Sequence, residues 1–154
     1  MTNGLWIGGA VVAAVAVLAL AWRPLRRLGR EMVAARAREA FRLQRQRLEA
    51  RFFEAASASG KPRGLRWKEC TYEPAMELVR DRRSGQLLAL VPVTIAFEAV
   101  EGGPMEGVEA VGNLRSATAV FAFDRGHWTT AGKAVFNMDP ALTIQHFAGQ
   151  YERV

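Results

Sequence analysis

The residues of this chain with the most versatile side-chain chemistry are two histidines, one cysteine and a group of glutamates. His127 and His146 have no Cys, Asp or Glu at the spacing of a metal site. A nucleophile paired with either histidine would need a strained elbow or an orienting carboxylate, and no such motif is present. Asp124, close to His127, is more typical of a hairpin turn. We therefore predict no catalytic residue, no metal site and no cofactor.

The single cysteine, Cys70, has no second cysteine with which to form a disulfide inside the chain. This suits a reducing compartment such as the cytoplasm. Its neighbour Glu69 would raise the thiol pKa rather than lower it. A reactive role for Cys70 is therefore not expected.

A glycine-rich acidic segment is the most unusual part of the C-terminal half. Its carboxylates are Glu98, Glu101, Glu106 and Glu109, and glycines stand between them. The spacing matches no EF-hand loop. A solvated loop is the simpler interpretation, and contact with a cation or a basic partner is the alternative.

A charge-free run followed by arginines is the clearest signal in the sequence. Leu5 to Trp22 is 18 residues of Leu, Val, Ile, Ala, Gly and Trp. At about 1.5 Å per residue such a helix is just long enough to cross a bilayer. We expect contacts with the membrane interface and lipid headgroups from the two tryptophans and four arginines at its ends: Trp6, Trp22, Arg23, Arg26, Arg27 and Arg30.

The arginines all follow the apolar run, so the positive-inside rule predicts the orientation. We expect a single-pass protein of the cell inner membrane with its N terminus outside and its C-terminal domain in the cytoplasm. Two alternatives stay open. Ala19-Leu20-Ala21 fits a signal-peptidase site, which would make the chain a secreted or periplasmic module, although the n-region has no basic side chain. A buried core helix is the other.

Gly4 and Gly8 form one G-x-x-x-G spacing inside this region. Such a spacing lets transmembrane helices approach closely, but an Ala-rich sequence also produces it by chance. Helix pairing and ordinary composition both stay open.

The distribution of charge explains the high net charge. Residues 23–54 hold ten Arg and four Glu, whereas residues 55–154 hold 11 basic and 11 acidic residues. The entire excess of +6 therefore lies next to the apolar run. The remaining domain is neutral and has no basic stripe interleaved with aromatics, so we expect no nucleic-acid partner.

The pattern after the apolar run is helical and then changes to period two. We expect a short tail over 1–4, the transmembrane helix over 5–22 and a basic amphipathic helix over 23–58, with Pro24 marking a fresh start or a kink. A linker over 59–64 leads to an antiparallel domain over 65–154. Strands are expected over 65–72, 76–82, 87–99, 114–123 and 127–138, and a short helix after the N-cap Asp139. Pro92 places the third strand at an edge or bends it.

These elements predict an α+β fold in which a long amphipathic helix packs on a curved antiparallel sheet of four or five strands, with a short C-terminal helix. The stripe of Phe41, Leu48 and Phe52 is the expected cover of the apolar face of the sheet. A curved sheet can also enclose a pocket. Four aromatic residues would then line it, although an aromatic core is the simpler interpretation: Trp67, Phe97, Phe121 and Trp128.

Three strings carry a resemblance to known proteins: GKPRGLRW at Gly60–Trp67, EAVGNLRSATAVF at Glu109–Phe121 and WTTAGKAVFN at Trp128–Asn137. They resemble short single-pass bacterial membrane proteins catalogued as hypothetical, a likeness that implies no activity. The order of helix and strands is similar to the cystatin-like and nuclear-transport-factor-2-like architectures. We therefore expect a non-enzymatic module that binds a protein partner or forms a homo-oligomer at the lipid bilayer. A ligand-binding or enzymatic domain with an enclosed pocket is the alternative.

Overall fold

The computed structural model describes the backbone of residues 3–59 and 64–154, and the side chains of these residues except 3–11, 19–21 and 23–26. Contacts divide the chain into two compact units, Met1–Arg36 and Ala37–Val154. The expected linker over 59–64 lies largely outside the described residues.

One helix, α1 (Asn3–Ser59), replaces the two that the sequence predicts. It runs through position 24 without a break, so the expected fresh start at Pro24 is wrong. A single missing donor does not end a helix when Ala, Leu and Arg, all strong helix formers, surround it. Within the part of the chain that is described, no helix is both long and apolar enough to cross a membrane.

The second unit is α+β, as predicted, with an antiparallel sheet of seven strands among the described residues instead of four or five. The elements after α1 are, in chain order, β1 (Leu65–Tyr72), β2 (Glu77–Asp81), β3 (Leu87–Ala99), the 3-10 turn η1 (Glu109–Gly112), β4 (Arg115–Asp124), β5 (His127–Thr129), β6 (Ala134–Phe136), α2 (Pro140–His146) and β7 (Tyr151–Arg153).

Strand β3 lies at the centre of the sheet, so the prediction of an edge strand is wrong. It pairs with β4 on one side and with both β1 and β2 on the other. Pro92 falls in the gap between Leu90, where pairing with β2 ends, and Val93, where pairing with β1 begins. Its carbonyl accepts from the Glu73 N–H on that side, at 3.0 Å. The N–H and C=O of one strand residue point the same way, so the missing donor of Pro92 faces the gap and costs no bond to β4.

The strand expected over 127–138 is two short strands, β5 and β6, which both pair with β4. Gly132 lies between them with φ of +72°. A Cβ on Gly132 would lie 2.3 Å from the Ala56 backbone nitrogen, so only glycine allows this close approach to α1. Pairing with β4 is interrupted between β5 and β6, where the chain passes close to α1.

The helix stripe predicted from the sequence is confirmed as the cover of one face of the sheet, which we call the α1 face. Phe41, Leu48 and Phe52 are each at most 2% exposed. Phe41 meets Phe121 and Trp128 edge-on, with both centroid distances at 5.2 Å. The Trp128 indole N–H donates to the Ala37 carbonyl at 2.8 Å, which fixes strand β5 against the helix.

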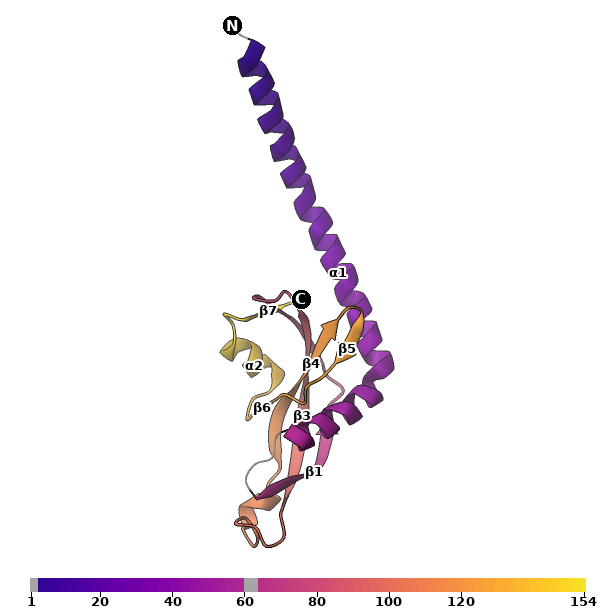
Figure 1. Cartoon of the computed structure of the whole chain (residues 1–154), viewed down its shortest axis with the longest axis vertical. Helices are drawn as coiled ribbons and strands as arrows, with labels where there is room; N and C mark the ends of the chain where they lie inside the picture. The colour runs from indigo at the N-terminus through magenta and orange to yellow at the C-terminus, as the bar shows by residue number, and fades with distance from the viewer. Residues whose placement is uncertain (1–2, 60–63) are drawn as a thin grey trace. The chain divides into compact units, whose positions relative to one another are not determined.

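The opposite side, which we call the outer face, carries a second core that the sequence did not predict. Helix α2 covers it at one end, as Figure 1 shows, and begins at the predicted N-cap: the Asp139 carboxylate accepts from the Leu142 N–H at 2.7 Å. The second core consists of Val79, Leu88, Leu90, Val120, Ile144 and Tyr151. Strand β7, also not predicted, closes this end by pairing with β2.

Candidate functional site

Among the described residues of the second unit, a helix covers the outer face of the sheet at only one end. Along β3 the side chains on this face change from Leu88 and Leu90, which are buried under α2, to Thr94, Ala96 and Glu98, which are half-buried. The change occurs beside Thr118 on β4, whose buried hydroxyl donates to the Met138 carbonyl at 2.8 Å. Beyond Thr118, the outer face has polar or small side chains, apart from Leu114 just before β4.

We call this second part of the outer face the open end. Its residues align across three strands, because Thr71 on β1 is opposite Thr94 on β3, which is opposite Ser116 on β4. In the next row, Glu69 lies opposite Ala96. Cβ atoms of directly opposite residues are about 5 Å apart, so the three hydroxyls form one continuous row.

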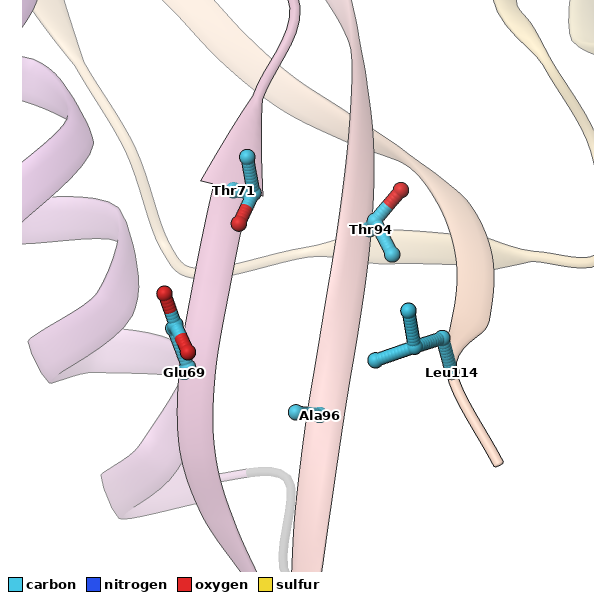
Figure 2. A pocket seen from close by; sticks show the side chains of 5 residues that line it. All are labelled: Glu69, Thr71, Thr94, Ala96 and Leu114. Atoms are coloured by element: carbon cyan, nitrogen blue, oxygen red, sulfur yellow. The ribbon is translucent and has the colours of Figure 1, made fainter. Parts of the chain in front are cut away.

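A shallow pocket of about 310 Å³ lies on the open end, and it is lined by Glu69, Thr71, Thr94, Ala96 and Leu114. Figure 2 shows the Leu114 side chain directed toward β3 from the beginning of β4, with Glu69 and Thr71 on the far side of β3. Leu114 is 66% exposed. The pocket therefore offers two hydroxyls, one carboxylate and one exposed apolar side chain.

Flanking charges on the open end are already paired. Arg66 on β1 lies opposite Glu98 on β3, and its Nε donates to the Glu98 carboxylate at 2.7 Å. This pair is largely exposed, so it contributes less than about 1 kcal/mol to folding. A partner can therefore contact or break the Arg66–Glu98 ion pair with little loss of folding free energy.

The four aromatic residues predicted as an alternative pocket lining lie on the α1 face and none lines the pocket of the open end. Trp67, Phe97, Phe121 and Trp128 are each at most 9% exposed. Trp67 packs against Phe97 and against Phe52 of α1, with centroid distances of 5.3 and 6.4 Å. This arrangement is the aromatic core that the sequence favoured.

Cys70 lies on β1 and is half-buried. Burial raises the pKa of its thiol to about 11, and the charge of Glu49 adds to the effect. The predicted source of the shift was Glu69, but that carboxylate lines the pocket on the outer face. Nearby, the Tyr72 hydroxyl donates to the Glu49 carbonyl at 2.8 Å, and burial also raises the pKa of Tyr72. The thiol is therefore protonated at neutral pH.

His127 lies at the beginning of β5 and His146 at the end of α2, whereas the acidic segment adjoins the open end, because Glu98 belongs to both. Asp124 precedes a two-residue turn, Arg125-Gly126, in which both φ angles are positive, as a type I′ hairpin requires. The Glu106 carboxylate accepts from the Gly102 N–H at 2.8 Å and so closes its own loop. Among the described residues, no group of three or more His, Cys, Asp and Glu side chains could hold a metal ion.

The predicted membrane-interface residues lie in the first unit. Trp22, Arg27 and Arg30 are exposed on α1. The side chains of Trp6, Arg23 and Arg26 lie outside the described residues. Contact of these six residues with lipid stays a prediction.

The open end was not predicted from the sequence, because the prediction of β3 rested on the apolar residues of its other face. A sequence signal for the open end is nonetheless present. At alternate positions from Leu88, the side chains of β3 are first apolar, at Leu88 and Leu90, and then polar or small, at Thr94, Ala96 and Glu98. Comparison of the chain with family models, curated proteins and solved structures finds no match in any of the three. The resemblance to single-pass bacterial proteins and to the cystatin-like architectures therefore stays a prediction.

Proposed function

We propose that this protein is a membrane-anchored, non-enzymatic module whose sheet domain binds a partner protein at the open end of its outer face. The observation that carries the proposal is the change along β3 from side chains covered by α2 to Thr94, Ala96 and Glu98. A sheet face with hydroxyls, the Glu69 carboxylate, one salt-bridged pair and one exposed leucine has the mixed polar character of a non-obligate protein interface. The partner expected is a polar protein surface that inserts an apolar side chain beside Leu114.

The anchor in this proposal comes from the sequence. Leu5 to Trp22 has no charged residue, and four arginines follow within eight residues. Together they support a single span of the inner membrane with the domain in the cytoplasm. Fusions of alkaline phosphatase and of a fluorescent protein to the C terminus test this orientation. An active phosphatase with a dark fluorescent fusion would instead favour the periplasmic alternative.

Site-specific photo-cross-linking tests the partner site. A photoreactive amino acid at Thr94 or Ser116 should give a discrete cross-linked product in native membranes. The matched control is Arg83, which is exposed in the turn between β2 and β3 at the other end of the sheet. Equal products from Thr94 and Arg83, or none from Thr94 and Ser116, would reject the open end as the binding surface.

The small-ligand alternative makes a different prediction for the same residues. A pocket of about 310 Å³ is at the lower limit for ligand sites. Substitution Ala96→Trp would fill it, and it should abolish small-molecule binding while adding apolar surface for a protein partner. If a metabolite stabilises the native protein against thermal unfolding and this stabilisation is lost in Ala96→Trp, the small-ligand alternative is favoured.

A further inference from the structure

Exposed apolar side chains continue along α1 beyond the predicted span, in the first unit. Leu28 and Met32 are 56% and 59% exposed, and their spacing of four residues places them on one side of the helix. We infer that this side pairs with the same side of a second copy of the chain in a parallel two-helix coiled coil. The inference rests on the proposed membrane anchor, because two copies anchored in one orientation are necessarily parallel.

A heptad register places Leu28 and Met32 on one side of α1 together with two further exposed residues. With Met32 at position a, Leu28 and Ala35 fall at position d, and Leu18, which is 63% exposed, falls at a two heptads earlier. Residues at a and d face the partner helix in a coiled coil. We call Leu18, Leu28, Met32 and Ala35 the seam.

The charges beside the seam are complementary between two copies. In this register Glu31 is at position g and Arg36 at position e. A parallel dimer brings the g residue of one helix near the e residue five positions later on the other, so each Glu31 meets one Arg36 of the other copy and the dimer holds two such pairs. Arg27 and Arg30 fall at positions c and f, away from the seam. Like charges therefore do not oppose pairing.

For the part of the seam beyond the predicted span, lipid is a poorer occupant than a second copy. At about 1.5 Å per residue, an upright helix carries Met32 roughly 15 Å past Trp22, beyond a headgroup layer of about 6 Å. The seam also has a defined end. The register next places Glu39 and Arg42 at a and d, and these two side chains pair within their own helix at 2.7 Å.

Disulfide cross-linking tests the seam, because the chain has only Cys70 to remove. In a Cys70→Ser background, Leu28→Cys, Met32→Cys and Arg30→Cys are expressed separately and oxidised in native membranes. We expect covalent dimers from Leu28→Cys and Met32→Cys and mostly monomer from Arg30→Cys at position f. Equal dimer from all three variants, monomer from all three, or a product with the mass of another protein would overturn the inference.

Charge exchange tests the register independently. Glu31→Arg in otherwise native chain should weaken dimerisation by roughly tenfold, because both pairs change from attractive to repulsive. Arg36→Glu should act similarly, and the double variant Glu31→Arg/Arg36→Glu should recover the dimer. A double variant no better than either single variant would overturn the parallel register.

The outcomes separate this inference from the proposed function. Release of the chain from membranes by alkaline carbonate would refute the membrane anchor. If the released chain is still dimeric, pairing through the seam is supported without the anchor. Conversely, partner cross-links at Thr94 that persist in a monomeric Met32→Glu variant would support the partner site and show that it does not require the dimer.

Discussion

Gly132→Ala should destabilise the second unit far more than the same substitution at Gly126. Both glycines have a positive φ, +72° at Gly132 and +85° at Gly126. The left-handed conformation costs an alanine about 1 to 2 kcal/mol, and this cost is common to the two variants. Only the surroundings of the added methyl group differ.

A Cβ at Gly132 would lie 2.3 Å from the Ala56 nitrogen and 2.6 Å from the Ala55 carbonyl carbon, whereas a Cβ at Gly126 would meet nothing within 4 Å. Helix backbone cannot rotate away as a side chain can, so α1 or the segment between β5 and β6 must move. Forced movement of this kind costs about 1 to 3 kcal/mol. We therefore expect a total of about 2 to 5 kcal/mol for Gly132→Ala and about 1 to 2 kcal/mol for Gly126→Ala.

Urea unfolding of the detergent-solubilised chain, followed by tryptophan fluorescence, measures this difference, because Trp128 is buried against α1. In thermal unfolding, each 1 kcal/mol should lower Tm by roughly 3 to 5 °C for a domain of this size. Equal losses in the two variants would refute the reasoning, since the contact between the strands and α1 would then contribute nothing at Gly132.

Three further predictions concern single groups. Trp128→Phe removes the indole N–H that donates to the buried Ala37 carbonyl at 2.8 Å, so it should cost about 1 to 3 kcal/mol in urea unfolding. A thiol pKa of about 11 instead of 9.0 should make iodoacetamide react with Cys70 about a hundredfold more slowly in native than in unfolded protein at pH 8. Hydrogen bonds from Gln150, Ser84 and Arg83 lower the pKa of Asp81 from 3.8 to about 2. This contribution to stability is present above about pH 4 and is lost as pH falls toward 2, and unfolding measured from pH 5 to 2 should show a smaller loss in Asp81→Asn.

The sequence was most informative where a pattern repeats over many residues of one element. The buried stripe of Phe41, Leu48 and Phe52 follows from helical spacing, and β3 follows from apolar residues at every second position from Leu87 to Ala99. Local turn chemistry was also sufficient: Asp81 accepts from the Arg83 and Ser84 N–H groups, and Gly85 has a φ of +73°. In each case the causes lie within a few residues of the effect.

Short strands and the position of β3 in the sheet could not be predicted in this way. Strand β7 has three residues, Tyr151–Arg153, and exists because it pairs with β2, which lies about seventy positions earlier in the chain. Pro92 indicated an edge, but its missing donor faces the gap between β1 and β2, which only the assembled sheet creates. Pairing between distant segments leaves little trace in local composition.

The sequence by itself determined the charge-free run, the arginines that follow it and the neutral character of the remaining domain, because these are properties of composition along the chain. Tertiary structure decided which side chains are available to a partner. Trp67 and Phe121 became core, since α1 covers their face, whereas Thr94 and Leu114 stayed accessible because α2 has seven residues and covers only one end of the other face. Exposure depends on the length and placement of a covering helix, and neither is encoded in the strand that it covers.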